Sequence, residues 1–143
     1  MTFSQLVDYP VQIQLPVAWG EMDAFEHVNN VVYFRYFESA RIAYFDQINY
    51  SKLMKDEGKG PILASTSCRF RKPLRYPDQL TIGARVSELA DDRFTMQYRI
   101  CSHTLQGVAA DGEGLVVSYD YRANAKTRIP ASIRDAIMAL EKS

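Results

Sequence analysis

The first hydrophobic pattern along the chain has a period of two. It covers VQIQLPVAW, residues 11–19, where apolar side chains take every second position. These side chains are Val11, Ile13, Leu15, Val17 and Trp19. Because successive side chains of a β-strand point to opposite faces, the pattern predicts a strand with one buried face. Pro16 lies on the other face and cannot donate a hydrogen bond. The strand is therefore expected at a sheet edge, or with the Pro16 nitrogen turned outward.

From Asn30 to about Ile48 the hydrophobic period becomes that of an α-helix. Large side chains recur every three or four residues, and Phe34 and Phe45 widen the apolar stripe. The stripe consists of Tyr33, Phe37, Ala40, Tyr44 and Ile48, and the opposite side carries Arg35, Ser39 and Asp46. This spacing predicts an amphipathic helix of about 18 residues and roughly 27 Å. Asn29 or Asn30 is suited to cap it, because an Asn side chain accepts from the free N–H groups of the first turn.

The polar residues 49–60 end in two glycines and predict a loop with room for one short helical turn. Period-two alternation then returns in residues 61–74, 79–89, 93–103 and 107–122. In the first of these segments one face is expected to carry Ile62, Ala64, Thr66, Cys68 and Phe70. Gly112 and Gly114 in the last segment indicate a bulge or a close backbone approach. The breaks between segments are short, which favours antiparallel hairpins.

Residues 130–142 predict a short surface helix that begins near Pro130. The order is therefore one strand, one long helix, four strands and one short helix, which indicates an α+β fold in a single domain over residues 1–143. The aromatic stripe of the long helix must be buried, and the sheet offers the large apolar surface. We therefore expect a curved, antiparallel, five-stranded sheet wrapped around that helix.

Composition and charge narrow the function classes. Lys plus Arg and Asp plus Glu number 17 each, so nothing indicates a nucleic acid partner, although a small patch can still bind a compact anion. Cys68 and Cys101 lack a C-x-x-C spacing and are expected as reduced, half-buried thiols. No apolar run is long enough for a membrane span, and residues 1–10 lack the pattern of a signal peptide. These features favour a cytoplasmic protein without a membrane partner.

The segment EMDAFEHVNN, residues 21–30, concentrates three carboxylates, one His and two Asn just before the predicted helix. A carboxylate such as Asp23 at this place lies near unpaired N–H groups, which favour its charged form. It can therefore activate water or attack a carbonyl. Spacing alone favours a simpler interpretation, in which Asp23 caps the helix or fixes the turn. Two His and no clustered Cys argue against a metal site.

The segment WGEMDAFEHVNNVVYFRYFESAR, residues 19–41, closely resembles the opening of hotdog-fold acyl-CoA thioesterases of the 4-hydroxybenzoyl-CoA thioesterase type. The family pattern runs D-x-x-G-H-V-N-N before the helix. FRKPLRYPDQL, residues 70–80, resembles the strand and proline turn of that family, and VAADGEGLVVSYD, residues 108–120, resembles its last core strand. The resemblance extends from about residue 11 to residue 130. At position 26 this chain has Glu where the family usually has Gly, and a left-handed backbone there costs Glu about 1 kcal/mol or more.

The resemblance implies catalytic roles for two residues, Asp23 as general base or nucleophile and Asn30 through its backbone N–H. That N–H would polarise the thioester carbonyl. It also implies a homodimer or homotetramer, with sheets joined edge to edge and active sites at the subunit interface. Tyr33 is then expected to line the acyl pocket. His27 is expected to pack in the loop and to form hydrogen bonds with the backbone. We assign both residues to substrate binding. No cofactor is implied.

CRFRKPLR, residues 68–75, concentrates positive charge, and we assign Arg69, Arg71 and Lys72 to substrate binding. One interpretation is a solvated strand face and turn. The other is a clamp for the phosphates of coenzyme A. Glu38 is a rival carboxylate in mid-helix, for which we expect a structural pairing with Arg35 or Arg41.

Three functions remain open. The first is an acyl-CoA thioesterase that releases free acid and CoA. The second is a non-catalytic hotdog protein that binds acyl-CoA, an alternative that Glu26 motivates. The third is an acyl-ACP thioesterase, in which the basic stretch contacts an acidic carrier protein. A hotdog dehydratase is less favoured, because no His–acid pair is arranged across the helix start.

Overall fold

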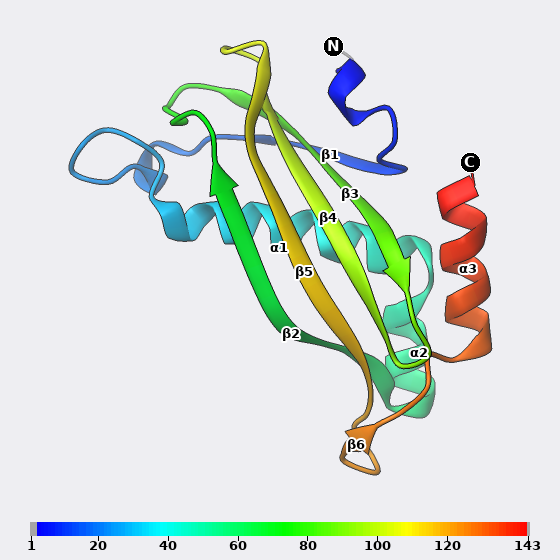
Figure 1. Cartoon of the computed structure of the whole chain (residues 1–143). Coiled ribbons are helices and arrows are strands. Elements are labelled where there is room, and N and C mark those ends of the chain that lie inside the picture. Colours follow the sequence, from blue (N-terminus) through cyan, green and yellow to red (C-terminus); the bar gives the residue numbers. More distant parts are fainter. Residues whose placement is uncertain (1–2, 143) are drawn as a thin grey trace.

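Five long antiparallel strands form one curved sheet, and the longest helix crosses its concave face (Figure 1). The computed structural model describes residues 3–142. The strands are β1 (Val11–Pro16), β2 (Lys59–Phe70), β3 (Gln79–Leu89), β4 (Arg93–Ser102) and β5 (Gly107–Asp120), in the spatial order β1-β3-β4-β5-β2. The two-residue strand β6 (Ala125–Lys126) pairs with β5. The expected sheet and its antiparallel hairpins are confirmed.

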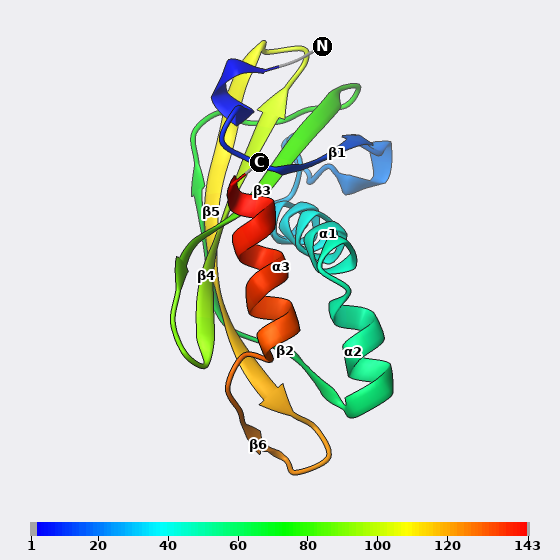
Figure 2. The same cartoon turned by 90° about the vertical axis from the view of Figure 1, so that its right-hand side faces the viewer.

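The helices lie to one side of the sheet (Figure 2). They are α1 (Asn30–Gln47), α2 (Tyr50–Glu57) and α3 (Ala131–Lys142), and short 3₁₀ turns occur at η1 (Ser4–Leu6) and η2 (Trp19–Glu21). The predicted long helix and the predicted final helix are therefore confirmed. Among the described helices, none is long and apolar enough to cross a membrane.

The aromatic stripe of α1 packs on the middle of the sheet, as its period requires. Phe37 is fully buried and stacks on Tyr98 of β4, with 5.0 Å between ring centroids. The space for the Phe37 ring exists because β5 has Gly112 there, where an added Cβ would overlap the ring. The close backbone approach expected at Gly112 is thus confirmed. Burying one such side chain contributes about 1.5–3 kcal/mol to stability.

Three sequence expectations about local structure are wrong. The strand over residues 11–19 ends at Pro16, and Trp19 stands in η2 with 71% of its surface exposed. Residues 49–60 contain a full eight-residue helix, α2, between the left-handed residues Asn49 and Gly58. A bulge between Leu63 and Ser65 breaks the alternation of β2. Because the bulge adds one residue, Leu63 and not Ile62 shares a face with Thr66, Cys68 and Phe70.

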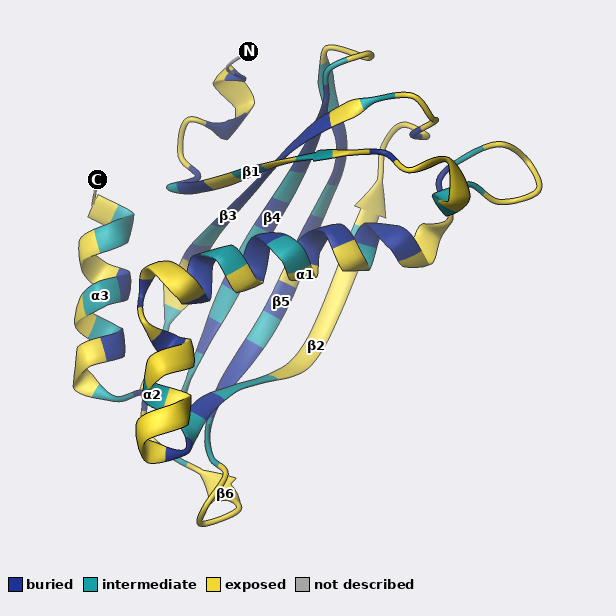
Figure 3. Ribbon diagram, turned by 180° about the vertical axis from the view of Figure 1, so that it is seen from behind, coloured by how far each residue is buried: buried dark blue, intermediate teal, exposed yellow. Residues whose placement is uncertain are grey.

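β2 lies at the open edge of the sheet and is mostly exposed (Figure 3). Its outer edge pairs with no other strand among the described residues. β1 forms the opposite edge, which agrees with the edge position that Pro16 predicts.

Candidate active site

Hydrogen bonds of Asp23 close the loop between η2 and α1. Its Oδ1 accepts hydrogen bonds from the backbone N–H groups of Phe25, at 2.8 Å, and His27, at 3.4 Å. The Asp23 N–H donates in return to the His27 carbonyl oxygen at 2.8 Å. The Asp23 side chain is also exposed, so it fixes the turn and still faces solvent. Both interpretations of Asp23 from the sequence therefore remain compatible with its geometry.

Glu26 at the tip of this loop has a φ of 63°. This is the left-handed conformation, which favours glycine, so the family's usual Gly at this position has a backbone reason. Glu26 keeps the turn geometry and bears the strain of a side chain there.

The start of α1 presents an unused backbone donor. Asn29 is the N-cap, and its Oδ1 accepts from the Val31 N–H at 3.1 Å. Asn30 is the first helical residue, and its N–H makes no hydrogen bond within residues 3–142. An N–H at this place carries the partial positive charge of the helix N-terminus. It is suited to a developing negative charge on an oxygen.

A cleft of about 260 Å³ brings this donor and Asp23 together. Six of the seven site residues predicted from the sequence line it, namely Asp23, His27, Asn30, Tyr33, Arg71 and Lys72. Val28, Phe70 and Pro73 complete the wall. The cleft thus combines a carboxylate, a helix N-terminus and two cations on one side of the molecule.

Tyr33 is fixed from two sides. Its hydroxyl accepts a hydrogen bond from the Leu74 N–H at 3.2 Å, and its ring meets Phe70 edge-on at 4.9 Å. Burial raises the pKa of the Tyr33 hydroxyl, so it stays protonated and keeps its own proton available to donate.

The His27 imidazole lines the cleft but makes no hydrogen bond to any described side chain or backbone group. The expected hydrogen bonding of His27 is made by its backbone instead.

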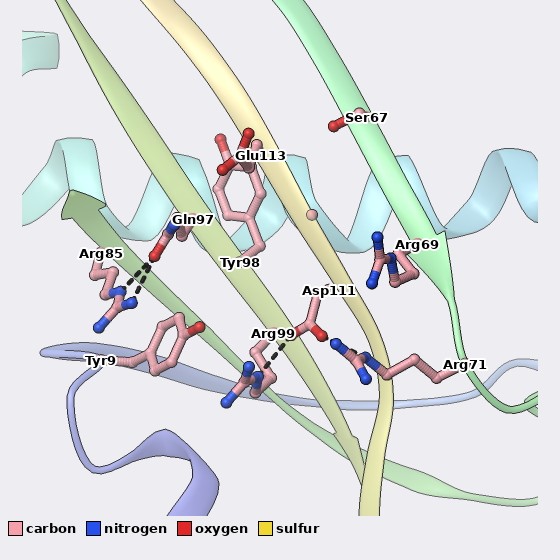
Figure 4. A pocket seen from close by; sticks show the side chains of 11 residues that line it. Tyr9, Ser67, Arg69, Arg71, Arg85, Gln97, Tyr98, Arg99, Asp111 and Glu113 are labelled. Carbon is pink, nitrogen blue, oxygen red and sulfur yellow. Dashed lines mark hydrogen bonds and ion pairs between the residues drawn. The ribbon is translucent and has the colours of Figure 1, made fainter. Parts of the chain in front are cut away.

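Arg69 does not reach the cleft. It lines a polar hollow of about 460 Å³ on the convex face of the sheet, together with Arg85, Arg99 and Asp111 (Figure 4). The reason is strand alternation: Phe70 points to the concave side, so its neighbour Arg69 points away. Arg71 follows the end of β2 and borders both hollows.

Asp111 holds Arg71 in place at this border. Its Oδ2 accepts from Arg71 Nε at 2.5 Å, and its Oδ1 accepts from Arg99 Nε at 2.6 Å (Figure 4). Two guanidinium groups on one carboxylate leave a net positive charge beside the cleft. Arg71 and Lys72 therefore border the cleft, while Arg69 belongs to the other face.

A connection between Glu21 and α1 was missed from the sequence. Glu21 Oε1 accepts from the Tyr36 hydroxyl at 2.9 Å and from the Ala18 N–H at 2.7 Å. The Glu21 carbonyl also accepts from the Asn29 N–H at 2.9 Å. Glu21 therefore ties both ends of the loop to the helix. Tyr36 lies three residues after Tyr33, on the same helix face, and this spacing is the one signal in the sequence that could have revealed it.

Glu38 is exposed and lies 4.0 Å from Arg41, so the structural pairing expected for it is confirmed. Among the described residues, no group of three or more His, Cys, Asp or Glu side chains is placed to hold a metal ion.

Comparison with known proteins gives one family match, to the thioesterase-like superfamily over residues 17–137. A crystal structure of a Thermus thermophilus thioesterase in complex with coenzyme A and zinc is 27% identical, with a TM-score of 0.85 over 96% of this chain and 98% of that one. A 1,4-dihydroxy-2-naphthoyl-CoA thioesterase from Synechocystis has a TM-score of 0.80 over 92% and 97% of the two chains. At 16% identity, it supports the fold alone.

An acyl-acyl carrier protein thioesterase from Arabidopsis thaliana is 28% identical over 125 residues, which are 86% of this chain and 65% of that protein. The curated relatives that match are longer than the region they share with this chain. The matched regions span 56–65% of their lengths.

Proposed function

The chain belongs to the thioesterase-like superfamily, and we propose that it hydrolyses acyl-CoA thioesters to a free acid and CoA. One observation carries the proposal: the cleft holds the Asp23 carboxylate and borders the helix start at Asn30, whose N–H has no other partner within residues 3–142. Thioester hydrolysis needs these two functions, a group that activates the attacking oxygen and a donor for the oxyanion. The coenzyme A bound by the Thermus thermophilus relative supports CoA as the thiol carrier.

In the proposed reaction, Asp23 removes a proton from water, and the oxygen attacks the thioester carbon. The developing oxyanion accepts from the Asn30 N–H. When the C–S bond breaks, the CoA thiolate departs and takes up a proton, and the free acid remains as the second product. Direct attack by Asp23 is the alternative first step, and water then cleaves the resulting anhydride. Tyr33 and His27 would line the substrate, and no metal or cofactor enters either route.

Arg71 and Lys72 would receive phosphates of CoA at the mouth of the cleft. The Arg71 guanidinium keeps free donors beyond the Nε that Asp111 occupies, and guanidinium groups bind phosphate in a bidentate manner. Arg69 would act only if the nucleotide extends onto the convex face.

We also propose a homodimer that forms through β2. Residues 61–68 of this edge strand carry no charge, and an exposed, uncharged strand edge favours pairing with another strand. Pairing would place the concave sides of two copies next to each other and shield Asp23 from bulk water. A tetramer would require a second interface. Light scattering of the protein and of a Leu63→Lys variant checks this assembly, because a charge on this edge should shift the dimer towards monomer.

An acyl-ACP thioesterase is the second candidate, and the Arabidopsis relative favours it. The proposal is tested by incubating the purified protein with acyl-CoA and acyl-ACP of one chain length and by measuring thiol release. We expect turnover of acyl-CoA. Saturable binding without thiol release would instead indicate a non-catalytic acyl-CoA binding protein, and turnover of acyl-ACP alone would indicate the second candidate.

A further inference from the structure

A second hollow, of about 370 Å³, opens between α1, α2 and β2. Its walls are mostly apolar and comprise Ile42, Phe45, Met54, Pro61, Leu63 and Val116. The polar side chains that line it are Arg41, Tyr50 and Ser51. A largely apolar cavity of this size with a few polar groups is typical of sites for small organic ligands.

Arg41 is the unusual member of this lining. It is only 8% exposed, although it carries a full positive charge. Its Nη1 donates to the Tyr98 hydroxyl at 3.1 Å, and its guanidinium lies 5.9 Å from the Tyr98 ring centroid. Its nearest carboxylate, Glu38, is 4.0 Å from Nη2, beyond hydrogen-bond distance, and that side chain is 63% exposed. Most of the five guanidinium donors therefore have no acceptor within residues 3–142.

Tyr50 also borders this cavity. Its hydroxyl is buried and makes no hydrogen bond to the described residues. The Ser118 hydroxyl is close enough to lower the pKa of Tyr50, against the larger rise from burial. Ser118 nevertheless donates its own hydrogen bond to the Arg128 carbonyl oxygen at 3.2 Å.

Buried charges in proteins are normally closely paired, whereas the one ion-pair partner printed for Arg41 within residues 3–142, Glu38, lies 4.0 Å away and is itself exposed. An anion that fits an apolar cavity would give the Arg41 guanidinium a closer partner. A carboxylate at the end of a hydrocarbon chain meets both conditions, because a guanidinium binds a carboxylate in a bidentate manner. We propose that this cavity receives the far end of the acyl group and that Arg41 selects acyl groups that end in a carboxylate.

The position of the cavity agrees with this role. It shares two elements with the Asp23 cleft. The helix α1 supplies Tyr33 to the cleft and Arg41 to the cavity. The strand β2 supplies Phe70 to the cleft and Leu63 to the cavity. Tyr33 and Arg41 are eight residues apart, which is about 12 Å along the helix axis. An extended acyl chain of medium length covers that separation. This step rests on the proposed thioesterase function, whereas carboxylate binding in the cavity does not.

The test uses two CoA thioesters of equal chain length, octanoyl-CoA and the half-thioester of octanedioic acid. For the parent protein we expect the higher kcat/KM with the carboxylate-ended substrate. Arg41→Gln should lower kcat/KM for that substrate by about tenfold. The same variant should change kcat/KM for octanoyl-CoA by less than about twofold. Arg41→Lys, which keeps the charge, should retain part of the preference. Arg35→Gln, on the exposed side of α1, is the matched control and should leave both values unchanged.

A binding measurement separates this inference from the proposed function and does not depend on a folded variant. Octanoate and octan-1-ol have the same hydrocarbon body, and we expect only octanoate to raise the melting temperature of the parent protein appreciably. Binding of octanoate but not of octan-1-ol by a parent protein that hydrolyses no thioester would contradict the thioesterase proposal alone. Two results would overturn the role of Arg41. One is an equal rise in melting temperature with octanoate and octan-1-ol, and the other is an equal fall in kcat/KM for both CoA thioesters in Arg41→Gln.

Discussion

The Tyr36 hydroxyl donates a 2.9 Å hydrogen bond to Glu21 Oε1 and so joins the long helix to the loop that carries Asp23. Burial, and then Glu21, raises the pKa of Tyr36 far above its ordinary value, so this donor is protonated at every physiological pH. The loop is therefore held by a contact 15 residues apart in sequence as well as by its own backbone turn.

Tyr36→Phe removes this contact and keeps the packing of the ring. We expect the free energy of unfolding to fall by about 1–2 kcal/mol, because the hydrogen bond to a carboxylate is lost. Urea denaturation measures this. Tyr119→Phe, which removes an exposed hydrogen bond to Asn124, is the control and should have a smaller effect. Equal effects of the two variants would show that the connection does not stabilise the loop.

Glu26→Gly should stabilise the protein by up to about 1 kcal/mol. The substitution removes the strain of a left-handed residue with a side chain, and this gain exceeds the added entropy of Gly in the unfolded chain. Ala24→Gly in the same loop does not replace a left-handed residue, so it should destabilise instead. Thermal unfolding of the two variants decides the question, and a lower melting temperature for Glu26→Gly would count against strain at this position.

Gly112→Ala should destabilise the protein by about 1–3 kcal/mol, since the new methyl group overlaps the Phe37 ring and approaches the Ser67 carbonyl oxygen. Gly20→Ala meets no atom within 4 Å and should change stability by less than about 0.5 kcal/mol. Similar stabilities of the two variants in urea would contradict the close contact between α1 and β5.

The two thiols predict a pH effect with a definite sign. Burial raises the pKa of both Cys68 and Cys101 from 9.0 to about 11. The folded protein therefore holds these protons more tightly than the unfolded chain. Their contribution to stability is complete below pH 9 and is lost as the pH rises to about 11. The double variant Cys68→Ala/Cys101→Ala should lose less stability over this interval than the parent protein. Parallel stability curves from pH 8 to pH 11 would contradict the burial of the thiols.

Local sequence patterns were sufficient to predict the five long strands, the helices α1 and α3, and most of the cleft. The loop and the first turn of α1 supply Asp23, His27, Asn30 and Tyr33 within eleven residues, so their proximity follows from the chain itself. Arg69 was misplaced because charge was counted along the sequence, whereas alternation in β2 sends it to the face opposite Phe70.

Other features depend on contacts that no local pattern contains. The bulge after Leu63 changes the register by a single residue, and strict alternation gives no sign of it. The burial of Arg41 depends on Tyr98, which lies 57 residues further along the chain. The helix α2 is short and polar, and it is stabilised by its packing on β2 and α1 rather than by its own sequence.

Asn30→Ala keeps the backbone N–H at the helix start, so the proposed oxyanion donor survives the change. We expect kcat for an acyl-CoA to stay within about threefold of the parent value, because the side chain is not the donor. A fall in kcat of two orders of magnitude or more would show that the Asn30 side chain, and not its backbone N–H, is the oxyanion donor.

The most direct test of the account is kcat of Asp23→Asn with an acyl-CoA that the parent protein hydrolyses. The amide keeps an oxygen that can accept from the Phe25 N–H, so the loop should stay closed and the melting temperature should change little. We predict a fall in kcat of at least about a hundredfold, because the amide neither removes a proton from water nor attacks the thioester. A folded Asp23→Asn protein with the turnover of the parent would contradict the assignment of Asp23.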